Sequence, residues 1–160
     1  MIILGIDPGT ATTGWGLIKS DNPHDLNLID FGIITTKPKQ PLANRIEQIY
    51  DQLLSLISQN SPNILAVENL FFNTNAKTAM LVGQARGAIL LAGKKSKIKI
   101  EEYTPLQVKI AVTGYGRADK NQVQQMVKTL LKLKDVPKPD DAADALAVAI
   151  TSALNSSSPL

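Results

Sequence analysis

The chain opens with an uninterrupted apolar run, residues 2–6, that ends at the carboxylate of Asp7. Such a run is typical of a strand that is buried on both faces. Proline cannot donate to a sheet ladder and glycine tolerates unusual backbone angles, so we expect the strand to turn at Pro8 and Gly9 and to return over residues 13–18. A carboxylate at the end of a buried strand is costly unless a cation or a donor satisfies it. Asp7 therefore either caps its own turn or belongs to a functional site.

A second apolar run ends in the same way. Residues 64–67 are all apolar and are followed by Glu68. Two buried strands that each end in an acid can lie side by side and bring Asp7 and Glu68 to one edge of a sheet, which favours the functional interpretation. An aromatic pair that includes Phe71 follows in a polar segment. We expect one of these rings to pack in the core, whereas an exposed ring there would stack on or wedge between bases.

The last helical segment carries further acids. Residues 137–150 begin with proline and aspartate and are then almost wholly small and apolar, which predicts a helix. We expect Asp140 to cap this helix and to interact with its dipole. Asp141 and Asp144 are three residues apart and share a face. Asp144 lies a full turn inside an apolar helix, so capping does not explain it.

The four acids Asp7, Glu68, Asp141 and Asp144 are expected to converge from two strand ends and one helix. Four uncompensated carboxylates repel one another and shift toward their neutral forms, whereas divalent cations hold them ionised together. Oxygen ligands favour Mg²⁺, with Mn²⁺ as a substitute. The sequence therefore predicts a metal site.

The hydrophobic periodicities predict an α/β fold. We expect one globular domain over residues 1–152, followed by a short flexible tail at 153–160. The expected segments, in order, are three antiparallel strands within 2–36, a helix at 42–60, a strand at 64–68, a helix at 76–94, a strand at 98–103, and helices at 106–112, 121–133 and 137–150.

Two glycines, Gly83 and Gly87, lie four residues apart in the helix expected at 76–94. A glycine inside a helix costs about 1 kcal/mol relative to alanine. The pair therefore indicates that another backbone approaches closely. That backbone belongs either to the sheet beneath the helix or to the same helix of a second subunit.

The composition excludes several classes of site. The chain has no cysteine, which excludes disulfides, zinc knuckles and thiol catalysis and leaves only oxygen ligands and His24 for a metal. The first residues lack the features of a signal peptide, and no apolar run approaches the length of a membrane span. We therefore expect a cytoplasmic protein.

Positive charge is concentrated in the middle of the chain. The net charge is +3, yet residues 94–138 hold eleven Lys and Arg against four Asp and Glu, which is +7 for that block. Such a block is typical of phosphate binding and also of an ordinary lysine-rich surface. Within it, the glycine-bearing loop 113–120 carries Tyr115, Arg117 and Lys120, a combination that suits a DNA backbone.

Four motifs occur in register along the chain: residues 5–9, 67–71, 83–87 and 141–146. Together they resemble the RuvC family of bacterial Holliday-junction resolvases, and the resemblance runs from residue 2 to about residue 152. It implies a ribonuclease H-like fold, with a mixed sheet of three antiparallel and two parallel strands flanked by helices. It also implies a homodimer that acts on four-way DNA junctions and works with a branch-migration helicase of the RuvA/RuvB type.

The resemblance carries over to single residues. The acidic quartet of the family matches Asp7, Glu68, Asp141 and Asp144 without substitution, and its junction-probing phenylalanine matches Phe71. Its DNA-contacting lysines match Lys109 and Lys120, and its dimer helix matches the helix that carries Gly83 and Gly87. Some relatives extend beyond residue 152 with a basic tail, whereas residues 153–160 here carry no charged side chain.

The mechanism that follows is two-metal phosphodiester hydrolysis, in which paired symmetric cuts resolve a junction during recombination and repair. Asp7 is best placed to contact both ions, and Lys120 to stabilise charge on the transition state.

Two alternatives to a junction-resolving nuclease remain. An ATPase of the actin and sugar-kinase type needs a second phosphate-binding hairpin and a second domain, for which 160 residues leave no room. A non-catalytic junction-binding module leaves the four acids unexplained.

Overall fold

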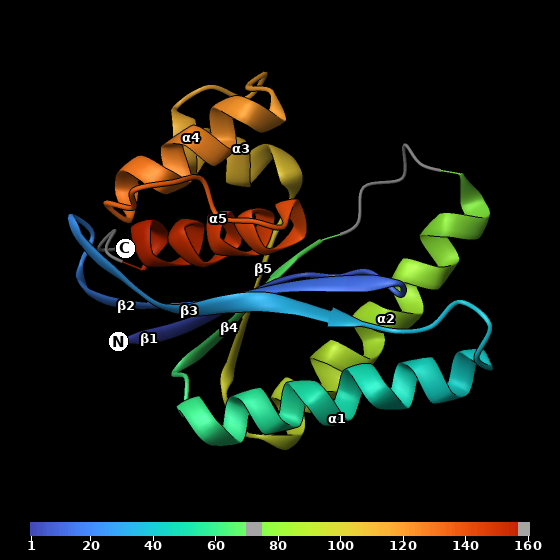
Figure 1. Ribbon diagram of the computed structural model, residues 1–160. Coiled ribbons are helices and arrows are strands. Elements are labelled where there is room, and N and C mark those ends of the chain that lie inside the picture. The colour runs from blue at the N-terminus through green and yellow to red at the C-terminus, as the bar shows by residue number, and fades with distance from the viewer. Residues whose placement is uncertain (70–74, 157–160) are drawn as a thin grey trace.

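The computed structural model describes residues 1–69 and 75–156. Its sheet has five strands in the order β3-β2-β1-β4-β5, with helices on both faces (Figure 1). The first three strands pair antiparallel, whereas β1 with β4 and β4 with β5 pair parallel, which confirms the mixed sheet expected from the sequence. The strands are β1 (Ile2–Asp7), β2 (Thr12–Asn22), β3 (Asp25–Thr35), β4 (Ile64–Glu68) and β5 (Lys99–Tyr103). The helices are α1 (Leu42–Asn60), α2 (Ala76–Lys95), α3 (Pro105–Thr113), α4 (Lys120–Leu130) and α5 (Asp140–Asn155).

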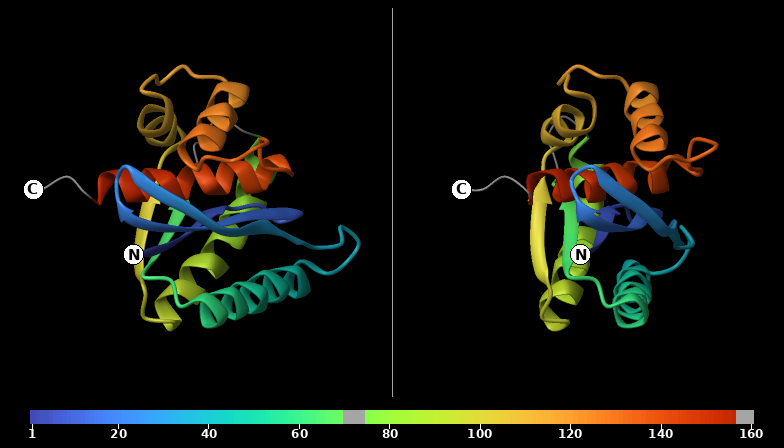
Figure 2. Two further views of the ribbon diagram at one scale, coloured as in Figure 1. Left: turned by 60° about the vertical axis from the view of Figure 1, so that its left-hand side comes forward. Right: turned by 90° about the vertical axis from the view of Figure 1, so that its left-hand side faces the viewer.

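The helices form two layers on opposite faces of the sheet. Helices α1 and α2 cover one face, and α5, with α3 and α4 packed beyond it, covers the other (Figures 1 and 2). Each interface has its own apolar core. The strands β1 and β4 therefore lie between two layers, which explains their continuous apolar sequences.

Glycines in β1 and β2 allow α5 to lie directly on the sheet. A Cβ atom at Gly5 would collide with the carbonyl oxygen of Ala145, and one at Gly14 would collide with the carbonyl oxygen of Asp141. Because these two strand positions have no side chain, the backbone of α5 approaches the strand backbone closely. This close approach brings the first turns of α5 to the end of β1.

Of the two glycines singled out in α2, Gly87 does not contact the sheet as one alternative supposed. A Cβ atom at Gly87 would meet nothing within 4 Å, and Gly83 is only half-buried. The position that needs a glycine against the sheet is Gly93, where a Cβ atom would lie 2.6 Å from Leu65. Sequence spacing alone did not identify it, because a glycine does not reveal which face of its helix it occupies.

The expectation that Asp140 caps α5 is wrong. The N-cap position is Pro139, which makes no side-chain cap bond, and Asp140 is the first residue of the helix. The carboxylate still lies in the first turn, where it interacts favourably with the helix dipole. At its other end α5 continues to Asn155 with Ala153 buried, so helical structure extends past residue 152, where a tail was expected to begin. Within the described ranges, no helix is long and apolar enough to cross a membrane.

Candidate active site

The sheet register places Asp7 beside Glu68. Strands β1 and β4 run parallel with Ile6 opposite Val67, and each strand ends at the next residue, which is the acid. The two carboxyl groups share a side-chain hydrogen bond. Both side chains are partly buried between the helical layers. The strand ends thus bring the two acids together, as expected from the two apolar runs.

Helix α5 brings Asp141 and Asp144 to the same place. In the β1–β2 ladder Asp7 is opposite Gly14, and the backbone of Asp141 lies on that glycine. The negative charges of Asp141 and Asp144 are close enough to affect the ionisation of Asp7. We call Asp7, Glu68, Asp141 and Asp144 the acidic cluster.

The environment of Asp7 strongly opposes its ionisation. Burial, followed by the charges of Glu68 and Asp144, raises the pKa of Asp7 from 3.8 to about 8. The hydrogen bond with Glu68 and the charge of Asp141 act in the same direction. The raised pKa of Asp7 favours a state near neutral pH in which one proton stays with the Asp7–Glu68 pair.

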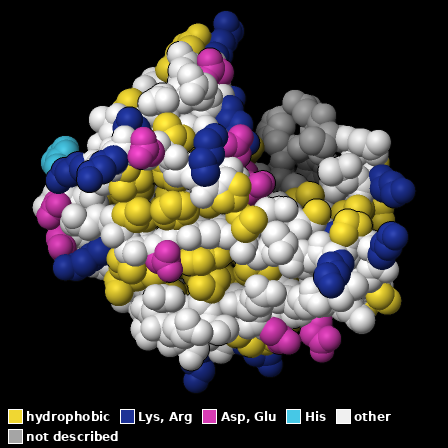
Figure 3. Space-filling model, in the orientation of Figure 1, with side chains coloured by type: hydrophobic (Ala, Val, Ile, Leu, Met, Phe, Trp, Pro, Cys, Tyr) yellow, Lys and Arg dark blue, Asp and Glu magenta, His cyan; other side chains and the backbone are white. Residues whose placement is uncertain are grey.

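Positive charge reaches the acidic cluster from α3 and α4. Burial raises the pKa of Glu68, and the charges of Lys120 and Lys109 oppose that increase. Burial also raises the pKa of Asp144, against a hydrogen bond from Lys120 whose Nζ lies 2.9 Å from Asp144 Oδ2. The same bond raises the pKa of Lys120. A small pocket of about 170 Å³ is lined by Lys109, Lys120, Glu68 and Asp144. In Figure 3 acidic and basic side chains lie next to one another beside a hollow in this part of the surface.

Known proteins share the sequence and the fold of this chain. A family model described as "Crossover junction endodeoxyribonuclease RuvC" matches residues 3–152. A protein of that description from Caldicellulosiruptor saccharolyticus is 52% identical over all of this chain and 96% of its own length. The chain belongs to the RuvC family. It is a crossover junction endodeoxyribonuclease, which confirms the family and the enzyme class expected from the sequence.

Two further members of the RuvC family support the assignment. The protein from Desulforamulus reducens is 57% identical over 150 residues, 94% of this chain and 91% of its own length. The structure described as "T. thermophilus RuvC in complex with Holliday junction substrate" is 35% identical with a TM-score of 0.93, and the match covers 98% of this chain and 95% of that chain. The ribonuclease H-like fold implied by the resemblance is thereby confirmed.

The other positions singled out in the sequence have different surroundings. Lys109 lies half-buried in the wall of the pocket beside the acids. Arg117 is exposed in the loop between α3 and α4 and does not line that pocket. Phe71 lies outside the described residues. His24 is exposed in the turn between β2 and β3.

The acidic cluster has the ligand types of a divalent metal site, but its side chains are not arranged around a metal position. Its donors are all carboxylate oxygens, which suit Mg²⁺, and burial, with the charges of neighbouring acids, raises the pKa values of Asp7, Glu68 and Asp144. Within residues 1–69 and 75–156, however, no group of three or more acidic or histidine side chains is arranged to hold a metal ion as it stands. Asp7 is hydrogen-bonded to Glu68, and Asp144 is paired with Lys120. A bound cation would replace the shared proton and compete with the ammonium group.

One contact of this site was missed at the level of sequence. Lys120 Nζ lies 3.7 Å from Asp140 Oδ2, and Asp140 Oδ1 accepts a hydrogen bond of 2.8 Å from Lys138. Asp140 therefore holds two lysines at the rim of the acidic cluster. The run of three acids at 140–144 could have indicated a charge role for each of them, but the capping interpretation removed Asp140 from consideration.

Proposed function

We propose that this RuvC family member resolves four-way DNA junctions by paired, symmetric, metal-dependent hydrolysis in recombination and repair. The observation that carries the proposal is a partly buried Asp7 whose pKa is raised to about 8 by burial and by the neighbouring acids of the cluster. Clustered carboxylates are the ligands by which a nuclease binds divalent cations. The bound cations offset the repulsion among these carboxylates and the unfavourable free energy of burying them. We further propose that residues 1–152 form the nuclease domain and that the enzyme acts in the bacterial cytoplasm.

The four members of the acidic cluster would hold Mg²⁺, with Mn²⁺ as a substitute and two ions in each site. When bound, the metal supplies Lewis-acid stabilisation of the phosphate and a water of lowered pKa. Asp7 lies beside both Glu68 and the α5 acids, which supports a role for its carboxylate in holding the ions. Asp7 would have to lose its proton for this role, and Lys120 would have to leave Asp144.

Lys120 is the group we assign to the phosphate. Its side chain is half-exposed, so its ammonium group can turn from Asp144 toward a substrate held at the acids. A preorganised cation that faces developing negative charge stabilises a transition state strongly in a partly dehydrated site. Lys109 and Arg117 would contact DNA phosphates on either side, and Phe71 would stack on or wedge between bases at the junction.

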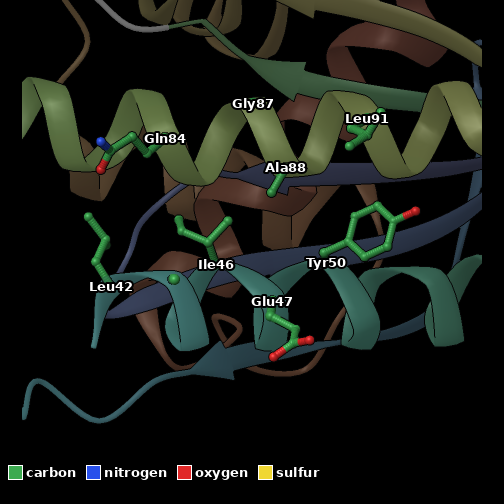
Figure 4. Close-up of a pocket in the computed structure, with 9 residues that line it drawn as sticks. Leu42, Ile46, Glu47, Tyr50, Gln84, Gly87, Ala88 and Leu91 are labelled. Carbon is green, nitrogen blue, oxygen red and sulfur yellow. The ribbon is translucent and has the colours of Figure 1, made fainter. Parts of the chain in front are cut away.

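We also propose a homodimer, because two symmetric cuts on a two-fold symmetric junction require two sites related by the same symmetry. A groove of about 720 Å³ between α1 and α2 supports a second copy as its occupant. Figure 4 shows Ile46, Tyr50 and Ala88 lying between the two helices, with Gly87 and Leu91 on α2 beside them. Leu91 is 51% exposed, and Gly87 leaves room for a second helix to approach α2. A helicase of the RuvA/RuvB type would be the partner on the junction.

The test is cleavage of a synthetic four-way junction with both strand pairs labelled. The protein should make paired nicks that require Mg²⁺ or Mn²⁺ and stop with a chelator. The Asp7→Asn variant should fold and bind the junction but not cut it, whereas Asp21→Asn, an exposed aspartate on β2, should cut normally. Cleavage by Asp7→Asn near the wild-type rate would overturn the proposal.

A further inference from the structure

Helix α3 exposes two large apolar side chains on one face. Leu106 is 56% exposed and Ile110 is 50% exposed, and their spacing of four residues places them side by side. The backbone of Gly116 packs against both, because a Cβ atom there would lie 2.8 Å from Leu106 Cδ1 and 3.5 Å from Ile110 Cγ1. We call Leu106, Ile110 and Gly116 the α3 apolar patch.

The fold does not account for the α3 apolar patch. Helix α3 packs into the core through Val108 and Val112, which are 5% and 3% exposed. Leu106 and Ile110 point away from that face, and polar side chains would serve a merely structural helix equally well there. Adjacent exposed apolar side chains on a folded protein commonly mark a contact with a partner.

The position of the patch indicates which partner that is. Pro105, Val108 and Lys109 line the pocket that contains Glu68 and Asp144, and Leu106 and Ile110 are the chain neighbours of these lining residues. Figure 1 shows α3 beyond the ends of β4 and β5, next to the first turn of α5. The patch therefore lies on the same short helix as residues that line the pocket at the acids.

The charges around the patch favour nucleic acid over a protein. Lys109 lies beside Ile110 on α3, Arg117 follows Gly116, and Lys120 begins the next helix. Apolar side chains adjacent in sequence to Lys109 and Arg117, with Asp119 as the one acid among residues 105–120, match a DNA strand, whose phosphates are anionic and whose deoxyribose edges are apolar. Leucine and isoleucine are among the apolar side chains that proteins place in the minor groove, where they insert between base steps.

We propose that the α3 apolar patch binds the deoxyribose edges, in the minor groove, of the junction arm next to the cleaved phosphate. This inference rests on the proposed function, since it requires a junction held at the acidic cluster. The patch positions the arm and takes no part in the chemistry. Its contribution is an apolar contact area, which Lys109 and Arg117 supplement with phosphate contacts.

The test compares junction binding at a series of salt concentrations, with Ca²⁺ replacing Mg²⁺ so that binding is measured without cleavage. The double variant Leu106→Gln/Ile110→Gln should keep its fold, because both side chains are already half-exposed. Its dissociation constant for a four-way junction should rise about tenfold. The slope of log K against log salt should not change, because no phosphate contact is lost. Lys109→Gln should instead reduce that slope by about one.

Ile29→Gln is the matched control, since Ile29 is 45% exposed on β3, at the opposite edge of the sheet from β5. It should bind the junction like the wild type. If the double variant also binds with the wild-type constant, the assignment of the patch to DNA is wrong and a protein partner becomes the better explanation. A changed salt slope in the double variant would overturn it as well. If the wild-type protein itself neither binds nor cuts the junction, the proposed function fails first.

Discussion

Lys120 Nζ lies 2.9 Å from Oδ2 of Asp144, although Lys120 begins α4 and Asp144 lies one turn inside α5. Asp144 is partly buried, and burial alone would favour its neutral form. The ammonium group offsets that effect and occupies a position where a positive charge is needed. Lys120 therefore acts as an internal counter-ion of the acidic cluster in the absence of a metal.

This pairing predicts opposite effects on metal binding and on catalysis in Lys120→Gln. Without the ammonium group, Asp144 has lost a competitor for cations, so the DNA-free protein should bind Mg²⁺ several-fold more tightly in a calorimetric titration. Junction cleavage should fall by about 100-fold, because a cation that faces the transition state is gone. Lys128→Gln, further along α4, is the control and should change neither. A weaker Mg²⁺ affinity in Lys120→Gln would refute the counter-ion role.

The raised pKa of Asp7, about 8, predicts how stability depends on pH. Between about pH 4 and pH 8 the folded protein holds a proton that the unfolded chain has released, so stability should fall as pH rises through this window. The Asp7→Asn variant has no titratable group at this position, so this contribution to the pH dependence of its stability is absent. In thermal unfolding with a chelator, the wild-type Tm should fall by roughly 5–10 °C relative to the variant between pH 5 and pH 9. Mg²⁺ at pH 9 should restore the wild type, because it binds the ionised form. Parallel pH curves for the two proteins would contradict this prediction.

Gly14→Ala should damage the site through the packing of α5. The added methyl group would collide with the carbonyl oxygen of Asp141, so the helix must shift away from β2. We expect a loss of about 1–3 kcal/mol in the free energy of unfolding, measured with denaturant. Cleavage should fall as well, because Asp141 and Asp144 move with the helix. Unchanged stability and activity would mean that α5 does not need this close contact.

Gly87→Ala separates the stability of one chain from that of the dimer. Nothing lies within 4 Å of the new methyl group, so helix propensity should stabilise the single chain by up to about 1 kcal/mol. If α2 faces a second copy there, the same methyl group should weaken the dimer in sedimentation measurements. Gly93→Ala, which would meet Leu65, should destabilise the chain itself. A dimer unaffected by Gly87→Ala would place the interface elsewhere.

Much of the fold was predictable because its signals are local. The apolar runs before Asp7 and Glu68 define β1 and β4 at their observed ends, and the helical periodicity of residues 42–60 gives α1 at its observed bounds. The prediction for Asp140 failed because an aspartate at the start of a helix can serve either as the N-cap or as an ion-pair partner. Asp140 suits a cap by residue type, yet the cap position is Pro139, and the carboxylate instead pairs with Lys138 and Lys120.

The sequence by itself determined which chemical groups are present and at which element ends they stand. Acids follow two buried strands, two more lie inside an apolar helix, and positive charge is concentrated in one block. Only the tertiary structure decided how these groups interact: that Asp7 shares a proton with Glu68, that Lys120 pairs with Asp144, and that Leu106 and Ile110 remain exposed. The physical reason is that ionisation and burial depend on distances and solvent access between elements far apart in the chain, which no local spacing encodes.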